Sequence, residues 1–262
     1  MFSLRIYQGL APAILGVGFF LLIGAASLAA LLRYSELSDW FGYLSQPYLW
    51  RVIRFSLWQA LLSSGISILI AIPVASCLAH RRFYGRAFLL QLFSVSMVVP
   101  TIVAILGLVV VYGRTGWLSQ LFGIQIPLYG LTGILLAHVF FNMPLAVRLL
   151  LQGYDLIPSG QWRQASQLGF SRYSAFRLIE WHYIKKALPG AFVLIFMLCF
   201  SSFAVVLSLG GGPKSSTLEV AIYQALRFDF DLSQASFFAL MQVMICTLFA
   251  VIVYRIAPVN RQ

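Results

Sequence analysis

Charged residues are scarce in this chain: Asp, Glu, Lys and Arg make up only 10% of its 262 residues. Soluble domains carry roughly 25% charged residues. Hydrophobic residues account for 61% of the sequence, and the mean hydropathy is +0.89. This composition excludes an ordinary soluble domain and is typical of a protein embedded in a membrane.

Carboxylates are absent from every long apolar run. The seven acidic residues are Glu36, Asp39, Asp155, Glu180, Glu219, Asp229 and Asp231. A carrier driven by protons or sodium usually needs a buried carboxylate or an ion site at a broken helix. Because we expect no buried carboxylate here, the energy for any transport is expected to come from another subunit.

Motifs for phosphate binding and hydrolysis are also missing. There is no Walker phosphate loop, no His-Glu-x-x-His zinc motif and no nucleophile elbow. Cys77, Cys199 and Cys246 fall inside apolar runs, at spacings that fit neither a disulfide framework nor a metal site. We therefore expect a non-catalytic chain that binds no cofactor or metal. An intramembrane hydrolase built on His138 with Ser201 or Ser202, or a self-sufficient carrier, is the alternative from another class.

What the sequence does contain is six uncharged runs, each longer than the roughly 18 residues that mark a membrane-spanning helix. They predict spans at about 10–32, 55–79, 87–112, 129–151, 187–209 and 236–254. The first run is too long for a signal-peptide core, so we expect it to be retained. The predicted fold is an all-α membrane protein with six transmembrane helices and a single domain over residues 1–262.

Basic residues are distributed unevenly around these spans. The net charge is +11, and with the N-terminus inside, twelve Lys and Arg residues fall on the cytosolic side and six outside. This is the positive-inside pattern, which predicts that both termini are cytosolic. It also places residues 153–186 inside and residues 210–232 outside. The basic charge is thus interpreted as a topology signal, and no nucleic-acid partner is expected.

A few polar or helix-breaking residues lie within the predicted spans. A proline inside a span frees a backbone carbonyl that neighbours or a wet cavity must satisfy. His138 and Asn142 are four residues apart and therefore share one helix face. Polar groups inside spans are candidates for a translocation path, and an interhelical hydrogen bond is the alternative. The candidate path residues are Pro100, His138, Asn142, Ser201 and Ser202.

Three consecutive glycines, Gly210, Gly211 and Gly212, lie at the end of the fifth predicted span and precede a proline. Such a run disfavours continuation of a helix. It predicts an outer hinge or a re-entrant turn. Residues 216–224 then have the pattern of a short amphipathic helix on the outer surface.

The stretch between the fourth and fifth spans carries its own helix signals. Pro158 and Ser159 mark a helix start, and Gly169 marks its end. Ser171 is placed to cap a second short helix. These signals predict a helix, a glycine turn and a second helix within a cytosolic loop at about 153–186. A small-residue helix of this kind suits docking into a partner's groove, and an ordinary basic connector is the alternative.

This stretch resembles the cytosolic coupling loop of permease subunits in binding-protein-dependent ABC importers. In that family Ile-Pro precedes a Glu-Ala-Ala-x-x-Leu-Gly segment, and a hydrophobic residue and Leu-Pro follow. Here Arg163 stands in place of Glu, Gln164 in place of Ala, and Trp181-His182 in place of Leu-Pro. The residues that the resemblance assigns to ATPase coupling are Ile157, Pro158, Gln161, Arg163, Gln164, Ala165, Leu168 and Gly169.

The resemblance implies a type I ABC importer permease fold within a larger assembly. Two ATPase subunits would use ATP and Mg, and a periplasmic substrate-binding protein would deliver the solute. A second permease unit, either another copy of this chain or a separate half, would complete the path through the lipid bilayer of the bacterial inner membrane. Helical spacing puts Gln161, Ala165 and Leu168 on one face, which we expect to meet the groove of the ATPase.

Other segments narrow the resemblance within the family. Residues 48–56, 135–142, 207–213 and 217–226 look like the amino-terminal half of thiamine importer permeases. Ferric-iron permeases share the triple-glycine and Thr-Leu-Glu-Val region and are the runner-up, along with permeases for other small solutes. The resemblance therefore implies transport of thiamine or a phosphorylated form, driven by a separate ATPase through residues 157–169.

Overall fold

The computed structural model describes residues 2–35, 40–81 and 83–256 of the chain. Within these residues the regular structure is helical throughout, with no strand. Glu36 and Asp39 lie outside the described part. The cytosolic location of the two termini remains a prediction.

Six described helical segments are long and apolar enough to cross a membrane, which confirms the predicted number of spans and the all-α class. Their bounds are Ile14–Tyr34, Pro47–His80, Thr101–Phe122, Leu131–Asp155, Arg172–Phe200 and Leu232–Val253. Pro73, Pro144 and Pro189 lie inside these helices without ending them. Membrane helices tolerate such prolines when neighbouring groups satisfy the freed backbone carbonyl.

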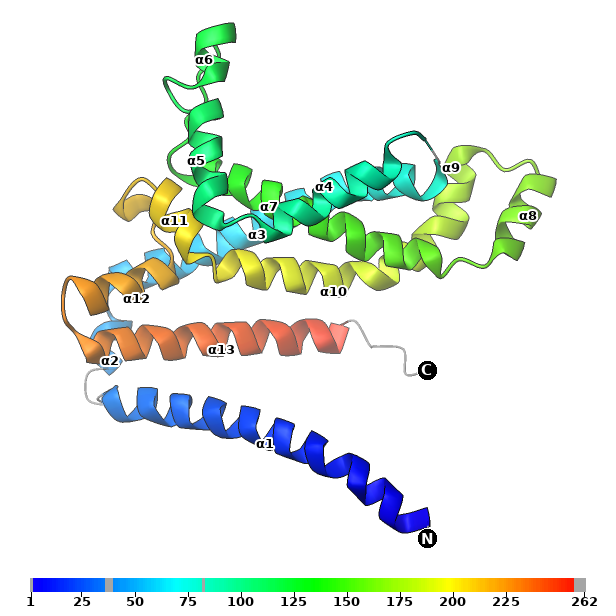
Figure 1. Ribbon diagram of the computed structural model, residues 1–262. Helices are drawn as coiled ribbons and strands as arrows, with labels where there is room; N and C mark the ends of the chain where they lie inside the picture. The colour runs from blue at the N-terminus through cyan, green and yellow to red at the C-terminus, as the bar shows by residue number, and fades with distance from the viewer. Residues whose placement is uncertain (1, 36–39, 82, 257–262) are drawn as a thin grey trace. The chain divides into compact units, whose positions relative to one another are not determined.

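The helices follow one another as labelled in Figure 1. They are α1 (Phe2–Tyr34), α2 (Trp40–Leu44), α3 (Pro47–His80), α4 (Arg86–Val98), α5 (Thr101–Tyr112), α6 (Trp117–Phe122), α7 (Leu131–Asp155), α8 (Ser159–Gln167), α9 (Arg172–Ala175), the π-helix η2 (Phe176–Glu180), α10 (Trp181–Phe200), α11 (Phe203–Leu209), the 3-10 helix η3 (Pro213–Ser215), α12 (Leu218–Arg227) and α13 (Leu232–Ile256). Long apolar helices thus alternate with short ones, several of which begin or end beside glycine, proline or serine. The short helix predicted at 216–224 is confirmed as α12.

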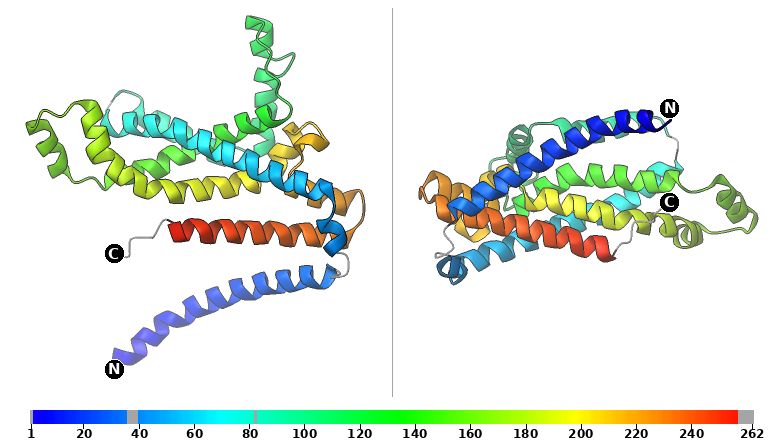
Figure 2. Two further views of the ribbon diagram at one scale, coloured as in Figure 1. Left: turned by 180° about the vertical axis from the view of Figure 1, so that it is seen from behind. Right: turned by 90° about the horizontal axis from the view of Figure 1, so that it is seen from below.

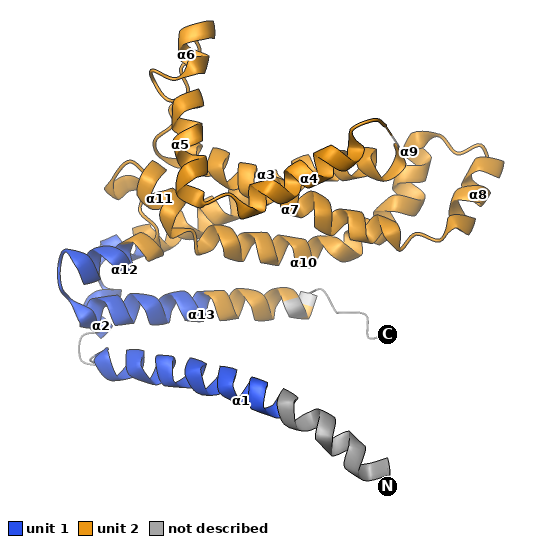
Figure 3. Cartoon of the chain, viewed as in Figure 1, with its two compact units in different colours: residues 1–50, 221–245 blue, residues 51–220, 246–262 orange. Residues whose placement is uncertain are grey.

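The described chain forms two compact units, which Figure 3 shows in different colours. Unit 1 combines residues 1–50 with residues 221–245, and unit 2 combines residues 51–220 with residues 246–262. All the candidate site residues belong to unit 2. This division does not test whether residues 1–262 act as a single domain, which stays a prediction.

Unit 1 is joined internally by aromatic side chains. The Trp40 ring lies 5.5 Å from the ring of Phe237, and the Tyr43 ring lies 5.4 Å from it. The Tyr43 hydroxyl also donates to Oδ2 of Asp231 at 3.5 Å. Helix α1, by contrast, buries none of the residues in its most apolar stretch.

Unit 2 is organised around α7. This helix packs against α4, α5, α10 and α11, and Figure 2 shows it running beside α10. Side chains of α5, α7 and α11 form a buried apolar cluster with Ile134, Ala137 and Leu209 at its centre. Because α7 has neighbours on several sides, its polar residues His138 and Asn142 are enclosed by protein.

The predicted third span, 87–112, is wrong as a single helix. α4 ends at Val98 and α5 begins at Thr101, with Pro100 between them at φ −55° and ψ 130°. α5 turns away from the line of α4 (Figure 1). Proline lacks an N–H and disfavours the helical conformation of the residue before it, so the chain breaks here and does not merely kink.

The predicted fifth span, 187–209, is wrong in both of its bounds. One continuous helical segment, Arg172–Phe200, runs through α9, η2 and α10. Ser171 caps it as predicted, accepting a hydrogen bond from the Ser174 amide at 3.2 Å. Ser201 and Ser202 then interrupt the helix before α11. The second helix of the predicted loop is therefore the beginning of a span.

Candidate functional site

The segment predicted to dock a partner folds locally as expected. α8 is followed by a turn that holds Gly169 at φ 63°, in the left-handed region. Two backbone hydrogen bonds close the turn: the Gly169 amide donates to the Ser166 carbonyl at 3.3 Å, and the Phe170 amide donates to the Ala165 carbonyl at 3.0 Å. These are the two bonds of a Schellman cap, which ends a helix sharply.

Side chains of α8 and its flanks divide between solvent and protein. The exposed ones are Pro158, Arg163, Gln164, Leu168 and Gly169. Ile157 and Ala165 are buried, and Gln161 is half-buried. The prediction that Gln161, Ala165 and Leu168 share one face is therefore wrong, because Ala165 is 6% exposed and Leu168 is 71% exposed. Leu168 is the C-cap, where the chain leaves the helix, so helical spacing no longer sets its direction.

Two side chains of α8 reach back to the long helices. Nε2 of Gln161 donates to the hydroxyl of Tyr183 on α10 at 3.0 Å. Trp162 packs edge-to-face against the imidazole of His80 at the end of α3, with ring centroids 4.8 Å apart. A helix this short is not stable in isolation, so these contacts fix where α8 lies.

A buried carboxylate lies next to these contacts, contrary to the expectation that the chain has none. Glu180, the last residue of η2, is 3% exposed. Its Oε2 accepts hydrogen bonds from Oγ of Ser76 at 3.1 Å and from the hydroxyl of Tyr154 at 3.0 Å. Its Oε1 lies 3.4 Å from Nε2 of His80. We call Glu180, Ser76, His80 and Tyr154 the Glu180 cluster; it joins α3, α7 and η2.

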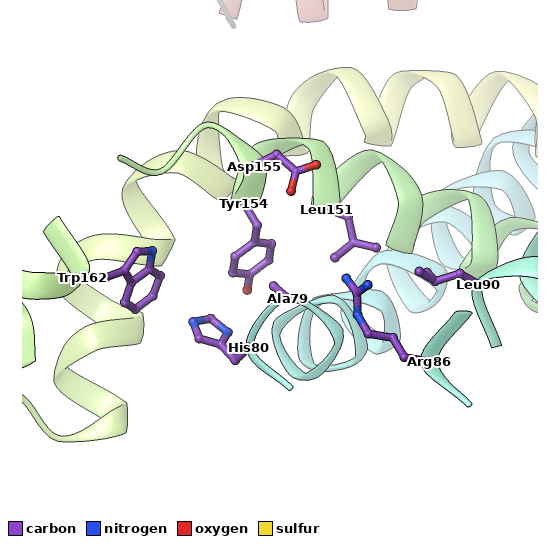
Figure 4. Close-up of a pocket in the computed structure, with 8 residues that line it drawn as sticks. All are labelled: Ala79, His80, Arg86, Leu90, Leu151, Tyr154, Asp155 and Trp162. Atoms are coloured by element: carbon purple, nitrogen blue, oxygen red, sulfur yellow. The ribbon is translucent and has the colours of Figure 1, made fainter. Parts of the chain in front are cut away.

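A cavity of about 460 Å³ opens beside this cluster (Figure 4). Its lining comes from α3, α4, α7 and α8, and consists of Ala79, His80, Arg86, Leu90, Leu151, Tyr154, Asp155 and Trp162. In Figure 4 the ring of His80 lies between those of Trp162 and Tyr154. The imidazole thus links α8 to the ends of α3 and α7.

His138 and Asn142, predicted at membrane depth, are residues of α7 whose side chains contact α3 and α10. They are 2% and 6% exposed. Nδ1 of His138 lies 2.9 Å from Oγ of Ser63, and Nδ2 of Asn142 donates to Sγ of Cys199 at 3.2 Å. These contacts favour the interhelical hydrogen bond that was the alternative to a path. Together with Gln59 these residues form what we call the His138 cluster.

Gln59 supplies a hydrogen bond to a backbone carbonyl at the end of α10. Helix ends leave their last carbonyls without intrahelical partners. Nε2 of Gln59, a fully buried residue of α3, donates to the Cys199 carbonyl at 2.9 Å. Oε1 of Gln59 and Nε2 of His138 are buried and have no hydrogen-bond partner among the described residues. The His138 cluster is therefore only partly satisfied.

The five candidate path residues fall into two separate groups. His138 and Asn142 are enclosed between helices, whereas Pro100, Ser201 and Ser202 lie at the two helix breaks. Pro100 and Ser201 are exposed, and Ser202 is half-buried. The helices after the breaks, α5 and α11, pack against each other. Broken helices offer free backbone carbonyls where they line a cavity. The path role of all five residues stays a prediction.

The triple glycine forms a packed turn after α11. Gly211 has φ 71°, and a Cβ on it would lie 3.2 Å from Cβ of Tyr129. The Gly130 amide donates to the Leu209 carbonyl at 2.7 Å. A side chain at position 211 would push these two segments apart. The hinge role assigned to Gly210, Gly211 and Gly212 stays a prediction.

Metal-binding groups do not gather anywhere in the described part of the chain. No set of three or more His, Cys, Asp or Glu side chains there is placed to hold a metal ion. Cys77, Cys199 and Cys246 are free thiols. Among the described residues, the chemistry on offer is hydrogen bonding, the buried carboxylate of Glu180 and an exposed capped helix.

Comparisons with known proteins relate this arrangement to a family. The family model described as "Binding-protein-dependent transport system inner membrane component" matches residues 67–261. Over 239 residues, 88% of this chain, the sequence is 47% identical to the thiamine transport system permease protein ThiP of Escherichia coli (strain K12). Over 194 residues, 72% of this chain, it is 54% identical to ThiP of Brucella abortus (strain 2308). These matches cover 45% and 36% of the two relatives, so the chain spans less than half of their length.

A solved structure has the same fold. It is a bacterial alginate ABC transporter in complex with an alginate pentasaccharide-bound periplasmic protein. The TM-score is 0.82 at 14% identity, and the match covers 98% of this chain and 96% of that one. At this identity the likeness concerns the fold alone.

Proposed function

The chain belongs to the family of binding-protein-dependent transport system inner membrane components, and from this premise we propose that it is the membrane-spanning permease subunit of an ATP-driven importer. The family match and the identity to ThiP confirm the resemblance drawn from the coupling loop. Six apolar helices make the chain a multi-pass membrane protein with an ABC importer permease fold. The bacterial inner membrane is its proposed location.

Thiamine, or a phosphorylated form of it, is the proposed solute. The support is the identity to the ThiP proteins of two genera. Because the chain spans less than half of those relatives, the activity of the whole transporter is a proposal here and not a property of this chain. Ferric iron or another small solute is the alternative.

Coupling is proposed to run through α8. The observation that carries this proposal is an exposed helix that a Schellman cap ends sharply, tied to the long helices by side chains at Gln161 and Trp162. Such a helix offers a partner a defined surface while its movement is passed to the spans. The exposed residues Arg163, Gln164 and Leu168 would meet the ATPase, and buried Ala165 would seat α8 on its own chain.

The proposed assembly contains two ATPase subunits, a periplasmic substrate-binding protein and a second permease unit. The second unit is a homodimer partner or a separate half. ATP and Mg are used by the ATPase subunits, and this chain itself is proposed to bind no cofactor and to catalyse no reaction. Its own role is to form half of the path and to receive the motion of the ATPase.

Reconstitution tests this function. The full chain is co-expressed with its ATPase and second permease unit, and placed in vesicles with the binding protein. We expect ATP hydrolysis stimulated by the binding protein, together with uptake of labelled thiamine. Stimulated hydrolysis with uptake of ferric iron in place of thiamine would overturn the solute. Thiamine uptake that needs no ATPase would overturn the importer and support a self-sufficient carrier.

A pair of variants tests the role of α8. Gly169→Arg places a side chain at a positive φ and a bulky charge at the end of the helix, so we expect uptake to be lost while the spans stay inserted. Arg163→Glu restores the residue usual in the family at an exposed position, and is expected to leave coupling intact or to improve it. Wild-type ATPase retention and uptake in Gly169→Arg would show that α8 is merely a basic connector.

A further inference from the structure

Glu180 is an acidic residue enclosed by protein at the junction of three helices. Its side chain is 4% exposed, yet three groups meet its two oxygens. Ser76 and Tyr154 donate to Oε2, and His80 faces Oε1. A buried carboxylate is stable only when its oxygens are paired in this way. The pairing therefore holds the ends of α3 and α7 against η2.

The hydrogen bonds of His80 fix where its protons lie. Nδ1 of His80 lies 2.8 Å from the backbone carbonyl of Ser76. A carbonyl only accepts, so Nδ1 carries a proton. Nε2 then faces the Glu180 carboxylate, and that contact is attractive only when a proton lies between the two groups. The pair is thus an imidazolium with a carboxylate, or a neutral imidazole with a carboxylic acid.

The same imidazole ring also contacts α8. Trp162 packs on the His80 ring from α8, and the Tyr154 ring packs on it from α7 at 5.8 Å, nearly perpendicular. The carboxylate orients the imidazole, and the imidazole orients Trp162. The other side-chain link from α8, between Gln161 and Tyr183, leads to α10, three residues beyond Glu180.

A π-helical turn puts Glu180 in this position. η2 covers Phe176–Glu180 between two α-helical stretches, and an inserted π-turn rotates the residues after it relative to those before. Glu180 is thereby buried, while Arg177 and Leu178, in the same turn, are exposed. Such turns are rare and are often found at functional sites.

We propose that Glu180 is a positioning residue for coupling: through His80 and Trp162 it holds α8 in a fixed orientation on the ends of α3 and α7, so that motion of α8 moves these helices together. This proposal rests on the proposed function for its purpose, but the holding of α8 is a property of this chain alone. Glu180 touches neither solute nor nucleotide in this role.

Hydrogen exchange of the full chain in lipid nanodiscs, without partner proteins, is the direct test. In Glu180→Leu we expect the amides of α8 to exchange roughly ten- to a hundredfold faster, as loss of hydrogen bonds to a charged group implies. Amides of α7 and α10 should keep their protection, which shows that the chain is folded. Trp162→Ala cuts the link beyond His80 and should free α8 in the same way.

The conservative variant separates positioning from general stability. In Glu180→Gln the amide oxygen can accept from Ser76 and Tyr154, and the amide nitrogen can donate to Nε2 of a neutral His80. We expect exchange in α8 within about threefold of wild type. Asp155→Asn is the matched control, because it neutralises an exposed carboxylate at the end of α7, and it should leave exchange in α8 unchanged.

Coupling is measured in the reconstituted importer. For Glu180→Leu and Trp162→Ala we expect more ATP hydrolysed per solute imported, and for Glu180→Gln a ratio near that of wild type. If α8 of Glu180→Leu or Trp162→Ala is as protected as in wild type, the positioning role is overturned. If wild type shows no stimulated hydrolysis but the exchange results hold, the proposed function fails and the holding of α8 stands.

Discussion

The two polar clusters of unit 2 use the same helices and hold different things together. The His138 cluster joins α3, α7 and α10 through neutral hydrogen bonds, and two of its buried polar atoms have no partner among the described residues. The Glu180 cluster joins α3, α7 and η2 through a carboxylate, and His80 extends it to α8. Both clusters therefore hold α3 against α7. Of the two, the Glu180 cluster is the one that also contacts α8.

Removing His80 from the Glu180 cluster should have the largest effect. His80→Ala leaves Oε1 of the buried Glu180 without its partner and removes the ring on which Trp162 packs. We expect a loss of roughly 3 kcal/mol, at the low end for a broken buried pair because the imidazole is 31% exposed. Unfolding in mixed micelles titrated with SDS measures the change.

The double variant His80→Ala with Glu180→Gln is the control for this loss. It removes both members of the pair, so part of the lost stability should return. A double variant as unstable as the sum of the two single variants would show that the two residues do not interact, and would remove the contrast between the clusters.

A matched deletion in the neutral cluster should have a smaller effect. Ser63→Ala removes the partner of His138 Nδ1, and Nε2 of this ring already has none among the described residues. Leaving a buried polar group unpaired costs about 1.5 kcal/mol. The same micelle titration measures it, and exchange in α8 should stay at the wild-type rate. Faster exchange in α8 would mean that both clusters hold this helix.

A variant at Gly169 tests whether the Schellman cap also stabilises α8. Gly169→Ala adds only a methyl group, and no atom lies within 4 Å of the new Cβ. The cost is therefore the positive φ, about 1 kcal/mol. We expect faster exchange in the last turn of α8 and unchanged exchange near Trp162. Gly160→Ala, which also meets open space but lies inside α8, should show no such loosening.

The smallest effect is expected at Asn142. Its amide donates to a thiol, which is a weak acceptor, so Asn142→Leu should cost less than about 1 kcal/mol. Because Asn142 is enclosed between helices, uptake per assembled complex should remain at the wild-type level. A selective loss of uptake would return Asn142 to the translocation path. Cys199→Ala, which removes the same contact from the other side, is the paired control.

Much of the fold follows from patterns along the chain. Six uncharged runs predict the number of spans, and Pro158, Gly169 and Ser171 predict the helix, turn and capped helix between two of them. The helix break at Ser201 carries no such signal, since serine is common inside membrane helices. Beside this break the Cys199 carbonyl accepts a hydrogen bond from Gln59, a residue 140 positions away. Pro100 signals a disturbance, but not whether the helix kinks or breaks.

The Glu180 cluster was the part that sequence reasoning missed. Glu180 has basic residues on either side in the sequence, which suggests a solvated loop. Its partners Tyr154 and Ser76 lie 26 and 104 residues away, so no local pattern joins them. The π-turn that directs Glu180 inward has no recognised residue signature in this chain. The one available signal was a carboxylate between Ile179 and Trp181, two apolar residues.

The continuous helical segment Arg172–Phe200 connects the Glu180 cluster to the helix break at Ser201. Its 29 residues make a rod of roughly 43 Å, close to the full thickness of a bilayer with its headgroups. Glu180 lies in its first third, and the break at Ser201 follows its last residue. A tilt of about 5° imposed at the first end displaces the second by about 4 Å. In the proposed importer this rod would act as a lever arm, and a small rotation passed to it from α8 would shift the helix break at Ser201 by about 4 Å.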